Sequence, residues 1–504
     1  MAQPWALLKS SPKRLDSYVA RAYNVAKASE YEDCLILSRW GPLSMKTLLV
    51  QPSTPKRSIG YDKLYMDEPL ALEYLGADIS QVSDVKVLDM RVDDNFLKEV
   101  ESFQPDIVGL TGYIIHVPAI RSICQQVKKL KPEVLTIVGG QQATVSTDDF
   151  VHPDIDIIVI GDGVPTLKEI IQKKEKGEKF GEIKGIAFHQ NGKLIQTEAR
   201  PLTHLDEFPF PDRSLTKQYR KHYHNERLQF DAMFRTSRGC PHRCNFCTQW
   251  KLTNGKYLTR SVEKVVEELQ QTGEDSINFI DDEAFLDVNR MNRLADAIEA
   301  VGIKKKYLAL ARSDTVLRNP ELMQKWQKIG LDSLLMGFEF YSQEDLDYVG
   351  KGTSPEKNEQ AIKLLQSLDI NLYPLFMVRP DYDETNFKAF AQYVKGLDFN
   401  GMVQFSVLTP LPGSDLFDEL KAQILDLDLE YFDCMHTVLP TKLPLKEFYA
   451  QFAKLYRDSG SWQSYLRFLR TLPPTRVISI AWLHYRLLSR LRNLYKEYPP
   501  GYRI

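Results

Sequence analysis

The sequence predicts an α/β protein with an open parallel sheet in the N-terminal half, a partial β/α barrel after it and a helical C-terminal region. In both halves, short β-branched runs alternate with helix-like stretches, which is the pattern of βαβ units. Prolines punctuate a segment between the halves. The chain has 504 residues, 43% of them hydrophobic. This length is enough for about three domains with sizeable cores.

In the first half, one helix and several strands are expected. Val117–Leu130 has apolar residues at helical spacing and is the clearest helix. Strands are expected at Lys46–Gln51, Lys86–Asp89, Ile107–Thr111, Leu135–Val138 and Ile157–Ile160. The expected organisation has five parts: an N-terminal extension (1–45), this sheet domain (46–180), a linker with a hairpin at Asn191-Gly192 (181–225), the barrel (226–430) and the helical region (431–504).

Small and polar residues collect after three of these strands. Ligands of parallel sheets bind at the carboxyl ends of the strands. Glycine there lets the backbone approach a large flat ligand, although tight turns between strand and helix explain it equally well. The residues are Thr111, Gly112, Tyr113, Gly139, Gly140, Gln141, Gln142, Gly161, Asp162 and Gly163.

Charge and composition exclude several classes of protein. Lys and Arg total 65 against 67 Asp and Glu, which argues against a nucleic-acid binder. Six cysteines in 504 residues exclude a disulfide scaffold. Neither a signal peptide nor a membrane-spanning run is visible, so we expect a cytoplasmic protein. A GxGxxG motif and a P-loop are both lacking, which disfavours a nucleotide ligand.

Three cysteines form the strongest motif of the sequence. Cys240, Cys244 and Cys247 have the spacing Cys-x3-Cys-x2-Cys. A 4Fe–4S cluster is usually held by four thiolates, so three close cysteines leave one iron open to another ligand. The alternative is a zinc site with His242 as the fourth ligand.

A second series of strands follows the cysteines and predicts the barrel. These strands are Ser276–Ile280, Tyr307–Ala311, Ser333–Phe338, Leu372–Met377 and Val403–Leu408. Chemistry in such folds lies at the C-terminal ends of the strands. The candidate residues there are Asp281, Asp282, Glu283, Arg312, Glu339, Arg379 and Thr409. Helix capping and internal salt bridges are the alternatives for these charges.

The cysteine motif resembles the signature of the radical SAM superfamily, and Phe246 before the last cysteine fits it as well. The resemblance implies that S-adenosylmethionine (SAM) chelates the open iron and is reductively cleaved to a 5′-deoxyadenosyl radical. An electron donor such as flavodoxin or ferredoxin would supply the electron. Phe246, Asp281, Asp282, Glu283, Arg312 and Glu339 are the SAM-binding residues that it implies.

The order of the two halves resembles the cobalamin-dependent radical SAM enzymes. This resemblance implies a flavodoxin-like (Rossmann-like) cobalamin-binding domain ahead of the barrel, with the ten loop residues above around the cobalamin. The sequence lacks the Asp-x-His-x-x-Gly motif that supplies an axial histidine in related domains. His116 is the single histidine near these loops and is an alternative cobalt ligand.

Three segments resemble the hopanoid C-3 methylase family: 312–319, 409–414 and 432–449. The resemblance implies methylation of an unactivated carbon of a lipid-like polycyclic triterpenoid. One SAM would yield the radical that abstracts hydrogen, and a second would supply the methyl group through cobalamin. Oxidative cyclisation or hydroxylation of a tetrapyrrole is one alternative. A tRNA methylthiotransferase is another, although Cys34 and Cys124 are too far apart for a second cluster.

The C-terminal tail is basic and aromatic. Residues 461–504 contain seven arginines and Lys496 against a single acid, Glu497, with Trp, Tyr and Leu interleaved. A helix of this kind can lie in a membrane interface, and a core-packed helix with a solvated arginine face is the alternative. The first reading predicts a peripheral contact with the membrane near a lipid substrate.

Overall fold

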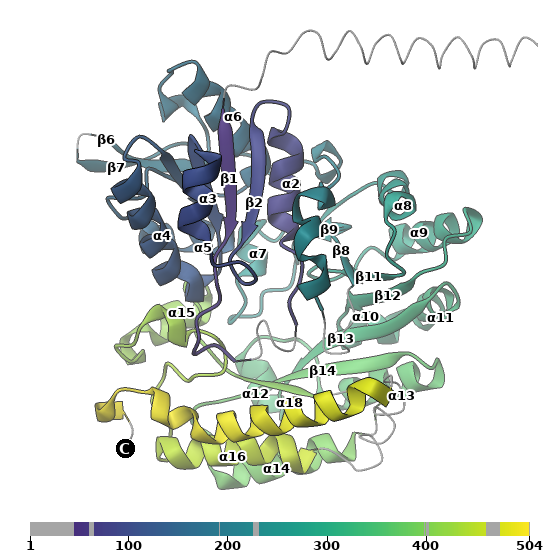
Figure 1. The fold of residues 1–504 in the computed structure, drawn as a ribbon. Coiled ribbons are helices and arrows are strands. Elements are labelled where there is room, and N and C mark those ends of the chain that lie inside the picture. Colours follow the sequence, from purple (N-terminus) through teal and green to yellow (C-terminus); the bar gives the residue numbers. More distant parts are fainter. Residues whose placement is uncertain are drawn as a thin grey trace, which may run out of the picture.

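The computed structural model describes residues 45–59, 65–190, 192–224, 231–397, 399, 403–459 and 474–502. Within them, two separate sheets carry helices and face one another, and a helical C-terminal region packs on the second sheet (Figure 1). The predicted fold class is confirmed.

The first sheet has seven strands in the order β2-β1-β3-β4-β5-β6-β7. Strands β1 (Lys46–Gln51), β2 (Asp84–Asp89), β3 (Ile107–Thr111), β4 (Leu135–Gly139) and β5 (Ile157–Val159) are parallel. The helical segments of this part are α2 (Leu70–Ile79), α3 (Phe96–Phe103), η1 (Ile114–His116), α4 (Val117–Leu130), α5 (Gln141–Val145), η2 (Thr147–Phe150), α6 (Gly163–Glu175) and η3 (Phe180–Glu182). Helix α4 has the predicted bounds and buries its apolar face, including Ile120, Ile123 and Val127.

The hairpin expected at Asn191-Gly192 belongs to this same sheet. Strand β6 (Ile186–Gln190) pairs antiparallel with β5, and β7 (Lys193–Gln196) pairs antiparallel with β6. The sheet therefore continues beyond residue 180, and we propose that the first domain extends to residue 196. Two 3-10 segments, η4 (Leu205–Glu207) and η5 (Arg213–His222), then lead to the second sheet.

The second sheet has six parallel strands in the order β15-β14-β13-β12-β11-β8. They are β8 (Ala232–Phe234), β11 (Ser276–Phe279), β12 (Lys306–Leu310), β13 (Leu331–Glu339), β14 (Asn371–Val378) and β15 (Gln404–Val407). The helices are α7 (Gln249–Leu252), α8 (Val262–Gln271), α9 (Val288–Ala300), α10 (Ser313–Arg318), α11 (Pro320–Lys328), α12 (Gln343–Tyr348), α13 (Pro355–Ser367) and α14 (Glu384–Gly396). An open parallel sheet of this kind, with a helix after most strands, is the predicted partial barrel.

The C-terminal region shares the core of the barrel. Phe448, Leu491 and Tyr498 are buried in the same apolar cluster as the barrel strands. Helix α15 (Asp415–Leu420) and the segments η6 (Lys421–Gln423) and η7 (Leu429–Tyr431) lead from the last barrel strand to this region. Its own segments are α16 (Leu445–Ser459), α18 (Pro474–Asn493), η8 (Leu494–Glu497) and η9 (Pro500–Tyr502). Among the described residues, none of these or the other helices is long and apolar enough to cross a membrane.

Candidate functional site at the facing sheet edges

The cysteine loop begins at a position that only glycine fits. Strands β9 (Ser237–Arg238) and β10 (Leu258–Thr259) form a short antiparallel pair that holds the chain before the first cysteine. Gly239 then has a φ of +92°, and a Cβ there would lie 2.1 Å from the carbonyl oxygen of Lys256. This close approach turns the backbone directly into Cys240.

The three thiols lie within electrostatic reach of one another. Cys244 is buried, Cys240 and Cys247 are partly exposed, and all three are free thiols. Burial raises the pKa of Cys247 to about 12, and the nearby sulfurs of Cys244 and Cys240 also raise it. The sulfur of Cys247 accepts a hydrogen bond from the backbone N–H of Gln249 at 3.4 Å. Among the described residues, no group of three His, Cys, Asp or Glu side chains is arranged to hold a single metal ion.

Asp281 and Asp282, at the end of β11, are bound to the segment that leads into the cysteines. Asp281 is fully buried and accepts hydrogen bonds from the N–H groups of Thr236 and Ser237 at 2.7 and 2.9 Å. The Thr236 hydroxyl also donates to it at 2.5 Å. Asp282 accepts from the N–H of Gly239 at 2.7 Å. Both carboxylates therefore position the loop through its own backbone.

Glu283 differs from its two neighbours because one of its carboxylate oxygens has no partner. It is 1% exposed, and its Oε1 is buried without a hydrogen bond. Burial raises the pKa of Glu283 to about 7, and the positive charge of Arg312 opposes this rise. An unpaired buried carboxylate is costly, so Glu283 is suited to receive a cationic or hydrogen-bonding group.

A second buried pair lies beside the cysteines. Lys351 donates to Glu339 at 2.7 Å, and Arg312 donates to the carbonyl oxygen of Lys351 at 2.6 Å. Burial would lower the pKa of Lys351, but the Glu339 carboxylate outweighs this effect and raises it. The thiol of Cys244 is close enough to raise the pKa of Lys351 as well. Arg312 also pairs with Asp314 at 2.9 Å. Arg312 and Glu339 thus both contact Lys351, and each forms an internal ion pair, which is the alternative that the sequence left open.

Lys351 is a residue that the sequence analysis missed. It lies between Gly350 and Gly352, both with positive φ, in the turn after α12. This turn also contacts the cysteine loop, because Asn245 donates its N–H to the Val349 carbonyl at 3.1 Å. The Gly-Lys-Gly sequence was the available signal. Phe246, the predicted aromatic of the motif, packs against the barrel core.

The loops of the first sheet are shaped by their backbone more than by charge. Gly140 has a φ of +101°, and a Cβ there would lie 2.4 Å from the Thr111 hydroxyl. Gly161 has a φ of +89° and open space beside it. Tyr113 is 57% exposed at the end of β3. Gly112 lies against His116, while Gly139 ends β4 and Gly163 begins α6.

The polar residues of these loops are already engaged. Gln142 is buried and donates to Asp149 at 2.6 Å. Gln141 donates to the Thr248 hydroxyl at 2.9 Å, and Asp162 forms an ion pair with Arg238. Thr248 directly follows Cys247, and Arg238 is two residues before Cys240. The carboxyl edge of the first sheet is therefore bound to both sides of the cysteine loop.

His116 has a defined protonation state. Its Nδ1 accepts the N–H of Tyr113 at 3.1 Å, so Nε2 carries the proton of the neutral ring. Nε2 is buried without a partner. Burial and the charge of Arg91 lower the pKa of His116 to about 4. A neutral imidazole in this tautomer presents a hydrogen-bond donor at Nε2.

Two family models match the two sheets. Residues 65–171 match the B12 binding domain, and residues 234–394 match the radical SAM superfamily. The chain is 30% identical over 433 residues to the hopanoid C-3 methylase of Methylococcus capsulatus, covering 83% of this chain and 81% of the relative. The chain belongs to the cobalamin-binding radical SAM enzymes. Its cofactors are cobalamin, SAM and a 4Fe–4S cluster, and radical SAM enzymes need a reductant.

A second relative and a solved structure are also similar to this cobalamin-binding radical SAM enzyme over most of the chain. An uncharacterized methyltransferase of Pyrococcus horikoshii is 29% identical and covers 82% of this chain and 91% of the relative. The fold resembles that of the radical SAM methyltransferase TsrM from Kitasatospora setae, solved with tryptophan and a SAM analogue. The TM-score is 0.63 at 16% identity, with 90% of this chain and 98% of that chain covered.

The described residues fit these cofactors. Three free cysteines in one loop supply the thiolate ligands that a 4Fe–4S cluster takes. The backbone N–H that points at Cys247 suits a cluster thiolate. The open carboxylate oxygen of Glu283 suits a ligand ammonium group. On the first sheet, glycine loops and an exposed Tyr113 suit a broad neutral face such as a corrin.

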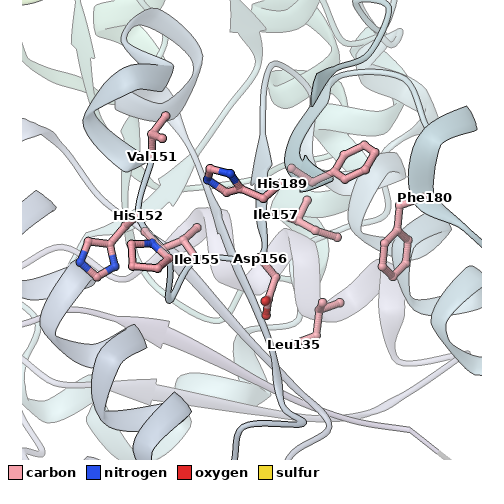
Figure 2. Close-up of a pocket in the computed structure, with 10 residues that line it drawn as sticks. Leu135, Val151, His152, Ile155, Asp156, Ile157, Phe180 and His189 are labelled. Carbon is pink, nitrogen blue, oxygen red and sulfur yellow. The ribbon is translucent and has the colours of Figure 1, made fainter. Parts of the chain in front are cut away.

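A cavity of about 560 Å³ lies elsewhere, at the amino ends of β4 and β5 (Figure 2). Leu135 and Ile157, the first residues of those strands, line it together with Phe180 and His189. Asp156 also borders it, but its carboxylate binds Lys128 at 2.5 Å and the Thr136 N–H at 2.8 Å. This cavity is on the edge of the sheet opposite to the cofactor loops.

Proposed function

We propose that this chain transfers a methyl group to an unactivated carbon of a lipid-like polycyclic substrate, with a hopanoid-type triterpenoid favoured. The observation that carries the proposal is the junction of the two sheet edges. Asp162 pairs with Arg238, and Gln141 bonds Thr248, on either side of the cysteine loop. A substrate between these edges would face both the radical source and the methyl donor.

The roles of the residues follow from their surroundings. Cys240, Cys244 and Cys247 would hold the cluster. Glu283 would accept the SAM ammonium, and Arg312 would bind the SAM carboxylate, with Glu339 near the ribose. Asp281 and Asp282 would position the cysteine loop. When bound, the cofactors supply a carbon-centred radical and a methyl donor, while the protein orients them and excludes water.

On the first sheet, we propose that cobalamin contacts the three loops from above the strand ends. It would be surrounded by three segments: Thr111 to Tyr113, Gly139 to Gln142 and Gly161 to Gly163. Gly161 supports this role, because the space where a side chain would stand is open to a flat ligand, while Gly140 lets its loop pass close to Thr111. His116 would donate its Nε2 proton to an acceptor of the ligand in place of binding cobalt.

The substrate class rests on the relatives. The hopanoid C-3 methylase covers most of the chain. A second candidate is oxidative cyclisation of a tetrapyrrole, because the anaerobic magnesium-protoporphyrin IX monomethyl ester cyclase of Cereibacter sphaeroides is 28% identical over 69% of this chain. That identity is spread over 58% of the relative, which favours the methyltransferase.

The test begins with anaerobic reconstitution of the full chain with iron, sulfide and hydroxocobalamin. SAM, a triterpenoid mixture and reduced flavodoxin or ferredoxin are then added. Methyl transfer predicts both 5′-deoxyadenosine and S-adenosylhomocysteine, and a product heavier by one methylene unit. Deoxyadenosine without S-adenosylhomocysteine would contradict methyl transfer, and a tetrapyrrole product heavier by oxygen in a parallel assay with a tetrapyrrole would support the cyclase or hydroxylase alternative.

A matched pair of cysteine variants tests the cluster assignment. Cys244→Ala should abolish the iron-dependent absorption and deoxyadenosine formation, because it removes one of three proposed thiolates. Cys124→Ala is the control: Cys124 is buried in the first sheet domain and should leave the iron content unchanged. Equal iron in both variants would contradict the assignment.

A further inference from the structure

One face of helix α18 is exposed although its opposite face belongs to the core. Leu491 of α18 and Leu494 of the following segment η8 are fully buried, and α18 packs along α16 on the outside of the molecule (Figure 1). Ile478 is 80% exposed, Trp482 57% and Tyr485 70%. These three are among the largest exposures of apolar side chains in the described part of the chain.

The three side chains form one stripe that ends in basic residues. Positions 478, 482 and 485 are spaced four and three residues apart, so they share one helix face. Exposed Arg486 and Arg492 continue this face toward the C-terminus, and exposed Lys496 follows in η8. The guanidinium of Arg486 lies 4.5 Å from the ring centre of Trp482. Residues 474–493 contain no acid.

We propose that this face of α18 docks on an anionic membrane surface, with the helix lying in the plane of the interface. Trp, Tyr and Ile enter the boundary between headgroups and acyl chains, and the arginines meet the phosphates. Tryptophan and tyrosine suit this depth because one end of each ring is apolar and the other is polar. The proposal stands apart from the identity of the substrate.

The docking helix is fixed to the body close to the cofactor edge. Arg490, on the side of α18 that faces the protein, donates to the carbonyl oxygens of Lys56, Arg57 and Ser58 at 2.7 to 3.2 Å. These residues follow β1 at the carboxyl edge of the first sheet. The C-terminal end of the docking helix is therefore tied to the segment that leaves the first sheet.

A second copy of the chain fits this face less well than a lipid surface. Three apolar side chains offer far less than the roughly 800 Å² per partner of a standard protein interface. In a two-fold dimer the same basic patch lies on both partners, so two surfaces that each carry Arg486, Arg492 and Lys496 would be brought together and repel. An anionic lipid surface complements this charge.

The test is sedimentation of the full chain with vesicles of phosphatidylcholine alone or with an equal share of phosphatidylglycerol. We expect binding to the anionic vesicles only. The double variant Trp482→Ser/Tyr485→Ser and the charge variant Arg486→Glu/Arg492→Glu should each weaken this binding at least about tenfold. Leu97→Ser/Val301→Ser is the matched control, because these apolar side chains are 45% and 47% exposed on other surfaces.

Several outcomes would overturn the proposal. They are equal binding of the double variant and the control, equal binding to neutral vesicles, and a dimer of the wild-type chain that Trp482→Ser/Tyr485→Ser dissociates. Because all substituted side chains are exposed, the melting temperature should stay the same in every variant. Deoxyadenosine formation with a detergent-dispersed substrate separates this test from that of the proposed function, since it should persist when vesicle binding is lost.

Discussion

Two clusters of acids in this protein differ in how their charges are paired. At the end of β11, Asp281 is saturated while Glu283 keeps one oxygen without a partner. In the C-terminal region, His436 lies between two carboxylates: its Nδ1 is 3.1 Å from Asp433 and its Nε2 3.4 Å from Glu497. In the second cluster His436 faces a carboxylate on each side, whereas in the first cluster one oxygen of Glu283 accepts no hydrogen bond.

The difference indicates how stability and binding are divided. A buried carboxylate that accepts backbone N–H groups holds the chain in place, and its loss leaves those donors unpaired. A buried carboxylate with an open oxygen costs free energy in the empty protein and recovers it when a ligand arrives. We therefore expect Asp281 and Glu283, two residues apart, to behave oppositely when substituted.

Asp281→Ala should have the largest effect on stability. It leaves two buried N–H groups and the Thr236 hydroxyl without an acceptor, which should lower the free energy of unfolding by about 4 kcal/mol. Urea denaturation of the cofactor-free chain measures it. The control Thr236→Val removes the hydroxyl alone and should cost about 1 kcal/mol. Equal midpoints for Asp281→Ala and the wild type would contradict the positioning role.

Glu283→Gln should leave stability nearly unchanged and weaken SAM binding. The amide keeps the size of the side chain and removes an unpaired buried charge, so the urea midpoint should stay or rise. A hydrogen bond between charged groups is lost, which should weaken SAM binding about 10- to 100-fold. Calorimetric titration of SAM into the reconstituted protein measures it. An unchanged affinity would show that the open oxygen serves no ligand.

The loops of the first sheet differ from both acid clusters because backbone conformation shapes them and buried acids do not. Gly140→Val places side-chain atoms against Thr111 at a positive φ. We expect at least about tenfold weaker retention of cobalamin with the iron content unchanged, since strain and bulk both act at this loop. Gly181→Ala, whose Cβ would lie 4.0 Å from Phe188, is the control. Absorption spectra after gel filtration report both cofactors.

The elements were predictable where the signal is local. The run Ile107–Thr111 and the periodic stretch Val117–Leu130 have their predicted bounds, because β-branched runs and helical spacing act over a few residues. The hairpin at residues 191–192 was predictable from its turn residues. Its pairing with β5 was not, because it depends on which distant edge is free.

The site was predictable by residue type but not by role. Asp281 and Glu283 are both acids at the end of the same predicted strand, so the sequence does not distinguish their roles. Only the fold reveals that Asp281 accepts the N–H groups of residues 236–237. Lys351 and Arg238 were missed for the same reason: each becomes relevant through a partner far away in sequence. The assignments to SAM and cobalamin stay predictions, which the variants above test.

The smallest effect is expected in the cluster around His436, where stability should depend on pH. Burial would lower the pKa of His436, but the Asp433 and Glu497 carboxylates outweigh it and raise the pKa above 6.5. When folding raises the pKa of a histidine, the resulting stabilisation is fully present below the pKa of the unfolded chain. It is lost as the pH rises through the pKa of the folded protein. The wild type should therefore lose stability relative to His436→Gln as the pH rises above 6. Urea midpoints of the two chains across pH 6 to 9 measure this difference. A constant difference would mean that the charge of His436 does not hold the cluster together, and that shape alone closes it.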